Sequence, residues 1–104
     1  MAYAEALAAL ADPTRRTVLE TLRQGSRSVG DLAGGLPVSR PAVSQHLRVL
    51  KNAGLVRERR VGTRNFYSVD GDGLAEVRDY FEAFWDEALA AFKDAAEREE
   101  GEDE

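Results

Sequence analysis

The sequence predicts a small, mainly helical domain with one short β-hairpin. Apolar residues recur at helical spacing in four segments, a capping box opens one more short helix, and an arginine-rich stretch around Gly62-Thr63 has the composition of a hairpin with its turn. With 104 residues and an apolar share of 43%, the chain has room for one globular domain. A domain of this size buries only a modest core, so association with a second subunit would add stability.

The first two helices are separated by Asp12-Pro13. Residues 3–11 are rich in alanine and leucine and form the first predicted helix. Asp12 caps the second helix with its side-chain oxygen, and Pro13 suits the first helical position because the N–H that proline lacks is unpaired there anyway. The second helix ends at Gly25. The apolar residues spaced for one face are Leu7 and Leu10 in the first helix, and Val18, Leu19 and Leu22 in the second.

Two short helices and a hairpin follow. Ser28 and Asp31 have the spacing of a capping box, which opens a third helix that ends by Gly34-Gly35. Ser39 caps a fourth helix, which Gly54 closes. The segments "LVRERR" (55–60) and "NFYSV" (65–69) are predicted strands.

One long helix is expected over residues 73–98, about 39 Å in length at 1.5 Å per residue. The segment 97–104 has no apolar content, so we expect a folded domain over residues 1–96 and a disordered acidic tail over 97–104. The tail is expected to aid solubility; the alternative is that it mimics DNA and competes for the basic segment.

The order of four helices, two strands and a closing helix is that of a winged helix–turn–helix. The chain also resembles the ArsR family of small bacterial repressors over residues 7–96. The matching stretches are "ALADPTRRTVLETL" at 9–22, "DLA" at 31–33, "SRPAVSQHLRVLKNAGLV" at 39–56 and "GTRNFYSV" at 62–69. The resemblance implies a repressor of transcription that binds operator DNA with the fourth helix and forms a homodimer through its first and last helices.

The charge of the chain is unevenly distributed. The formal net charge of −5 hides a segment, residues 39–64, with seven basic residues and the single acid Glu58. Residues 65–104 contain three basic residues and fourteen acids. Because the local field decides what a surface attracts, the basic segment is the candidate DNA-binding surface in spite of the acidic total.

The fourth helix has two distinct faces when it is projected at 100° per residue. One is apolar; the other is polar and basic, contains no acid and suits a major groove. Arg40 and Arg48 have the geometry to bind guanine, and Gln45 to bind adenine. Ser39 and Ser44 suit phosphate or a base edge, and Pro41 suits a thymine methyl group. The alternative is a surface helix with ordinary solvated arginines.

The hairpin over residues 55–69 carries basic residues around its turn. We expect Arg60, Thr63 and Arg64, nearest the tip, to contact the DNA backbone or the minor groove. Charged residues also protect an exposed strand edge from aggregation, and the two roles are compatible. Phe66 and Tyr67 point to opposite faces of their strand. The competing function is a winged helix that binds proteins instead of specific DNA.

The long helix has an apolar stripe that is broader than one small domain can cover. Part of the stripe closes the domain's own core, and we expect the rest to form a homodimer interface with the first helix. The residues expected at that interface are Tyr3, Leu7, Leu74, Val77, Phe81, Phe84, Trp85, Ala88, Leu89 and Phe92.

Several classes of function are excluded or disfavoured. The chain has no cysteine, which excludes disulfides and thiolate metal sites, and its single histidine, His46, falls on the apolar side of the fourth helix, where we expect a core residue. Ser28 and Gly30 stand where metal-sensing relatives carry thiols. No nucleophile paired with a base is visible, so we expect no enzyme, no metal and no cofactor. An organic ligand, a protein partner or no effector at all remain open.

The expected location is the cytoplasm. No apolar run reaches the length of a membrane span, and the first residues lack the basic start of a signal peptide.

Overall fold

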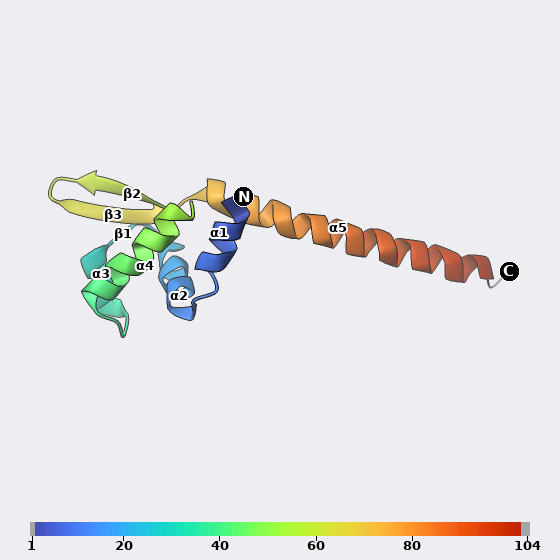
Figure 1. Cartoon of the computed structure of the whole chain (residues 1–104), viewed down its shortest axis with the longest axis horizontal. Helices are drawn as coiled ribbons and strands as arrows, with labels where there is room; N and C mark the ends of the chain where they lie inside the picture. The colour runs from blue at the N-terminus through green and yellow to red at the C-terminus, as the bar shows by residue number, and fades with distance from the viewer. Residues whose placement is uncertain (1, 103–104) are drawn as a thin grey trace.

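The computed structural model describes residues 2–102 and shows a compact body from which one long helix projects (Figure 1). Its longest dimension is 72 Å, and its radius of gyration is 19.5 Å, against about 13 Å for a compact chain of this length. The elements in order are α1 (Ala2–Ala9), α2 (Pro13–Leu22), β1 (Arg27–Ser28), α3 (Val29–Gly35), α4 (Arg40–Asn52), β2 (Val56–Val61), β3 (Arg64–Val69) and α5 (Gly71–Glu102). The predicted winged helix–turn–helix is confirmed.

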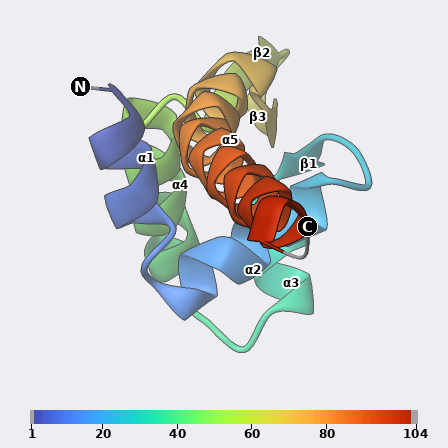
Figure 2. The same ribbon diagram turned by 90° about the vertical axis from the view of Figure 1, so that its right-hand side faces the viewer.

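The helix α4 is the centre of the core. Its residues Val43, Leu47 and Leu50 are fully buried. The helices α1, α2 and α3 and the strand β2 all contact α4, and Figure 2 shows these helices gathered in one body below and beside α5. The other buried apolar residues are Ala6, Ala9, Val18, Leu22, Leu32, Ala53, Leu55 and Val56.

The predicted helix caps are present. The Asp12 carboxylate accepts hydrogen bonds from the backbone N–H groups of Thr14 at 2.8 Å and Arg15 at 3.1 Å. Ser28 and Asp31 form the predicted capping box at the start of α3. The Ser39 hydroxyl accepts a hydrogen bond from the Ala42 N–H at 3.3 Å. These local contacts fix where each helix begins.

The sheet has one strand more than the sequence predicts. The expected hairpin is formed by β2 and β3, and the two-residue strand β1 pairs antiparallel with the other edge of β3. Arg27 lies opposite Tyr67 and Ser28 opposite Phe66. A strand of two residues has no periodicity to detect, because its pairing is set only when α3 and the hairpin come together.

The helix α5 is longer than expected. It begins at Gly71 and continues to Glu102, whereas residues 73–98 were predicted, and it therefore includes most of the segment expected as a disordered tail. An ion pair between Arg98 and Asp94, one turn apart at 3.3 Å, lies in this part of the helix. The division of the chain at residue 96 stays a prediction. No helix in residues 2–102 has the length and apolar character needed to cross a membrane.

Two glycines allow α5 to start against the end of α4. Gly54 ends α4 with a positive φ of 76°, and Gly73 lies with its backbone against that of Gly54. A Cβ atom placed on Gly73 would lie 1.9 Å from the Gly54 carbonyl oxygen. Since no real contact is that short, a residue larger than glycine at position 73 forces the two helices apart. This close approach sets the direction in which α5 leaves the body.

We predict that Gly73→Ala destabilises the fold by an amount at the upper end of the roughly 1–3 kcal/mol that overpacking costs. Gly71→Ala is the matched control, because a Cβ atom at Gly71 meets no atom within 4 Å. Its expected effect is below about 0.5 kcal/mol. Urea unfolding of both variants tests this, and equal stability of the two would show that the contact between Gly54 and Gly73 is not a constraint.

Candidate nucleic-acid interface

The outward face of α4 displays the residues that the sequence selects for it. The side chains of this face are all exposed, because the opposite face is buried in the core. They are Ser39, Arg40, Pro41, Ser44, Gln45 and Arg48. The Ser39 oxygen accepts the capping hydrogen bond, so its hydroxyl proton is the part left to donate to a ligand. His46, expected in the core, is only half-buried.

The hairpin of β2 and β3, here called the wing, presents its basic residues around an exposed turn. Arg60 donates a hydrogen bond from Nε to the Gly62 carbonyl at 3.1 Å. Thr63 is exposed at the turn. Arg64 donates from Nη2 to the Ser28 hydroxyl at 3.0 Å, and its guanidinium lies 5.1 Å from the centre of the Phe66 ring. The wing tip is therefore held to the start of α3.

The basic residues of segment 39–64 divide into paired and unpaired groups. Lys51 pairs with Glu58 at 3.0 Å, Arg57 with Asp70 at 3.2 Å, and Arg64 makes a longer contact of 3.8 Å with Asp31. The remaining four have no carboxylate oxygen within 4 Å among the residues that the structure describes. They are Arg40, Arg48, Arg59 and Arg60.

No ion pair within the described residues balances the charges of these four arginines, so they are candidates to bind an anionic ligand. Arg59 was not among the expected contacts. It lies opposite Phe66 across the hairpin, whereas Arg60 lies opposite Asn65 and therefore points to the other face of the sheet. The sequence places both at the wing but does not tell which of the two faces meets a ligand.

A polar hollow of about 410 Å³ lies where α3, the start of α4 and the wing tip meet. It brings together three of the expected DNA contacts, Arg40 from α4 with Thr63 and Arg64 from the wing. The remaining residues around it are Ser28, Val29, Gly30 and Asn65. We call it the α3–wing hollow.

Glu58, the only acid of the basic segment, joins the wing to α4. One carboxylate oxygen accepts a hydrogen bond from Lys51 of α4, and the other accepts one from the Tyr67 hydroxyl on the adjacent strand. The hydrogen bonds from Tyr67 and Lys51 lower the pKa of Glu58. Burial, and then the neighbouring carboxylate, raise the pKa of Tyr67 to about 12. Glu58 thus removes Lys51 from the free cations and fixes the base of the wing.

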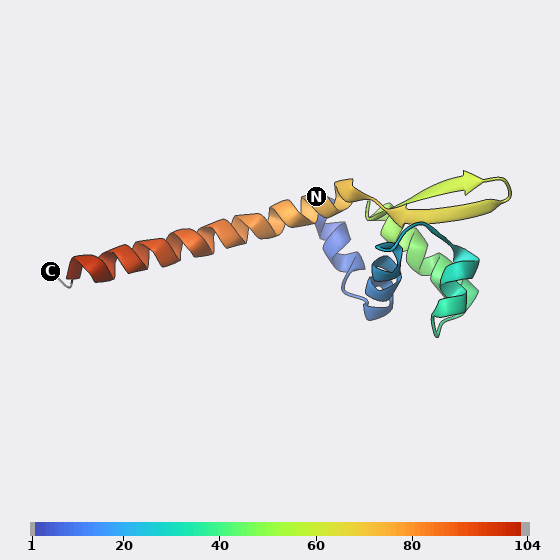
Figure 3. The same cartoon turned by 180° about the vertical axis from the view of Figure 1, so that it is seen from behind.

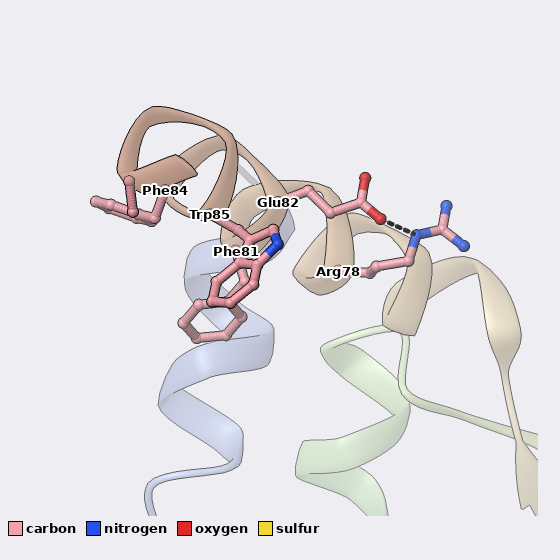
Figure 4. Close-up of a pocket in the computed structure, with 6 residues that line it drawn as sticks. Arg78, Phe81, Glu82, Phe84 and Trp85 are labelled. Atoms are coloured by element: carbon pink, nitrogen blue, oxygen red, sulfur yellow. Dashed lines mark ion pairs between the residues drawn. The ribbon is translucent and has the colours of Figure 1, made fainter. Parts of the chain in front are cut away.

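A second exposed surface lies on α5. Phe81, Phe84, Trp85, Leu89 and Phe92 are each at least half exposed, with Trp85 at 64% and Phe92 at 75%. Figure 4 shows Phe81, Phe84 and Trp85 beside the ion pair of Arg78 with Glu82. Together with Ala88, these residues line a shallow apolar hollow of about 540 Å³.

The other residues expected at the dimer interface lie closer to the body. Leu74 and Val77 are half-buried and pack against the core of their own chain. Leu7 is half-buried, and Ala88 is exposed. Tyr3 stacks on Tyr80 with 4.5 Å between ring centres, and Tyr80 also contacts the edges of Phe81 and Phe84. Tyr80 was missed from the sequence, although it falls on the aromatic side of the same helix.

Side chains that hold a metal ion do not gather in the described part of the chain: no group of three or more histidine, aspartate or glutamate residues has the required arrangement there. The acids Asp79, Glu82, Asp86 and Glu87 are exposed along α5.

Comparison with known proteins gives consistent matches. The sequence pattern of the family described as "Bacterial regulatory protein, arsR family" matches residues 12–58. The HTH-type transcriptional regulator Rv2034 of Mycobacterium tuberculosis is 55% identical over 84 residues, which is 81% of this chain and 78% of that protein. The transcriptional repressor SdpR of Bacillus subtilis is 39% identical over 62 residues, 60% of this chain and 69% of that one.

A solved structure gives the same answer for the fold. The homodimeric winged helix–turn–helix DNA-binding domain of Mb0332 from Mycobacterium bovis, a possible ArsR-family regulator, is 34% identical to this chain with a TM-score of 0.67. The match covers 85% of this chain and 82% of that one.

The contact between Glu58 and Tyr67 predicts a loss of stability in alkali. A folded-state pKa of about 12, above the ordinary value of 10, means that the folded protein keeps its phenol proton where the unfolded chain loses it. The contribution of this contact to the free energy of unfolding is therefore complete below pH 10 and is lost as the pH rises to about 12. Thermal unfolding across this range should show a steeper loss for the wild type than for Tyr67→Phe. Parallel curves would contradict the raised pKa.

Proposed function

The chain belongs to the arsR family of bacterial regulatory proteins and is a DNA-binding transcriptional regulator, and from this premise we propose that it is a dimeric repressor of a palindromic operator. The same comparisons confirm two expectations from the sequence: that the chain belongs to this family, and that it is a transcriptional regulator and not an enzyme. Repression is supported by the similarity of the chain to SdpR, a transcriptional repressor that is 39% identical over 62 residues. We place the protein in the cytoplasm, with the DNA.

The observation that carries the proposal is the division of α4 into a buried face and an exposed, acid-free face. A helix of 13 residues fits the major groove, and the burial of Val43, Leu47 and Leu50 leaves only the polar face to enter it. In this arrangement Gln45 hydrogen-bonds an adenine and Arg48 binds a guanine. Ser39 and Ser44 contact phosphate or a base edge, and Pro41 a thymine methyl group.

The wing contacts the DNA next to the groove that α4 enters. Arg60, Thr63 and Arg64 surround an exposed turn, and a turn of this kind meets a phosphate backbone or a minor groove without burying apolar surface. Glu58 links the wing to α4 through an ion pair with Lys51.

The dimer is supported by the exposed aromatic surface of α5 and by the homodimeric Mb0332 domain. We place Phe81, Phe84, Trp85, Leu89 and Phe92 at its centre, with Tyr3 and Leu7 of α1 beside them. Two subunits related by a twofold axis present two copies of α4 to half-sites about 34–36 Å apart. Binding of one half then raises the effective concentration of the other.

The first test is the dependence of binding on salt and sequence. Log affinity falls as log salt concentration rises, and each phosphate contact makes this slope more negative by about 0.9. The affinity of a winged helix that binds a protein depends little on salt. Gln45→Ala and Arg48→Ala should each lower operator affinity by about 1–3 kcal/mol, and should relax specificity at one base pair each. Arg23→Ala, an exposed arginine outside this surface, is the control. Binding without salt dependence favours the protein-binding alternative.

The second test is Trp85→Ala. Trp85 is 64% exposed in the single chain, so its loss should leave the fold of one subunit intact. It should shift the protein to a monomer in analytical ultracentrifugation and lower operator affinity by about a hundredfold or more. Glu87→Ala, an exposed change on the same helix, should do neither. A stable monomer with unchanged operator affinity would show that specific binding does not need the dimer.

A further inference from the structure

The α3–wing hollow is lined by two arginines from different elements, Arg40 at the start of α4 and Arg64 on β3. We propose that this hollow holds one phosphate of the DNA backbone, bound jointly by Arg40 and Arg64. Arg40 then contacts the DNA backbone. Its residue type alone suggests a different contact, with guanine. The inference rests on the proposed binding of operator DNA and assigns one part of that surface.

Arg64 is oriented before any ligand arrives. Its Nη2 donates to the Ser28 hydroxyl at 3.0 Å, and Ser28 is only 5% exposed, so the anchor is part of the body. The Asp31 carboxylate at 3.8 Å and the Phe66 ring at 5.1 Å hold the same guanidinium from two further sides. All these polar contacts use Nη2. Since a guanidinium has five N–H donors and the hydrogen bond to Ser28 uses one of them, further N–H groups are left to bind phosphate oxygens.

The charges around the hollow suit a single phosphate. Arg40 has no carboxylate within 4 Å in residues 2–102, and Arg64 has Asp31 as a partial counter-ion. With Asp31 counted, the two arginines leave one net positive charge, which matches the one negative charge of a backbone phosphate. Thr63 and Asn65, also at the hollow, offer neutral donors for the remaining oxygens.

The place of the hollow also favours the backbone over the bases. It lies between the first residue of α4 and the wing tip, whereas Gln45 and Arg48 lie further along the exposed face of α4. Contacts to phosphate commonly come from arginine side chains and from helix N-termini, and the hollow has both. A phosphate between them fixes how far α4 enters the groove.

The experiment combines protein variants with neutral phosphates. The operator duplex is prepared with a single uncharged methylphosphonate at each position in turn. Affinity is measured for the wild type, Arg40→Ala, Arg64→Ala and the double variant. Each single variant should lose about tenfold on operator and on random duplex alike, and should lower the salt slope by about one. One methylphosphonate should weaken the wild type by a similar factor and leave the double variant unaffected.

Arg59→Ala is the matched control, an exposed and unpaired wing arginine outside the hollow, and it should still respond to that methylphosphonate. Because Arg40 and Arg64 are both exposed, we expect the variants to keep the melting temperature of the wild type, and this result would exclude a folding defect. Two results would overturn the phosphate assignment. In the first, Arg40→Ala loses operator affinity only when one particular base pair is present. In the second, every methylphosphonate that weakens the wild type also weakens the double variant. A wild type without salt-dependent operator binding would overturn the proposed function itself.

Discussion

The complete burial of one face of α4 is the constraint on which the rest of the structure depends. Val43, Leu47 and Leu50 have no exposed surface, and four other elements pack against this helix. An α-helix completes one turn in 3.6 residues, so the apolar residues of α4 fall on one face and its polar residues on the other. Because the apolar face is buried, the polar face lies at the surface. Stability and the proposed recognition of DNA therefore depend on one element, and a change that loosens the core would also move the face that we propose for DNA.

Local chemistry accounts for most of the fold that could be predicted from the sequence. The caps at Asp12, Ser28 and Ser39 depend on contacts within three residues, and the two faces of α4 follow from its periodicity. The hairpin follows from two strand-like segments joined around Gly62-Thr63. The exposed faces of α4 and the wing could be predicted for the same reason, since they are what the core leaves out.

The features that were missed depend on residues that are distant in the sequence. β1 exists only because Arg27 and Ser28 reach the edge of β3, and the close approach of Gly73 to Gly54 sets the start of α5. His46 falls on the apolar face of α4, but like Ala42 and Val49 it is only half-buried, and projection by angle does not separate such a residue from a core residue. The joining of Arg40 and Arg64 in one hollow likewise needs the packing of α3 against the wing.

Shape separates the two kinds of charge. The wing tip and the C-terminal end of α5 lie at opposite ends of the molecule, as Figures 1 and 3 show, so the acids of the projecting part of α5 are far from the arginines around the wing tip. An acidic protein can thus approach DNA with a basic end first. The aromatic residues along α5 lie in the acidic half, and the second subunit that we propose would cover them without blocking the basic surface.

The most direct measurement is a map of backbone amide shifts by NMR during titration with an operator duplex. If the exposed face of α4 reads DNA, the largest changes fall on residues 39–48 and on the wing tip around Thr63, and the acidic end of α5 stays unchanged. Changes that are largest on the aromatic residues of α5 and absent from α4 would contradict the central claim.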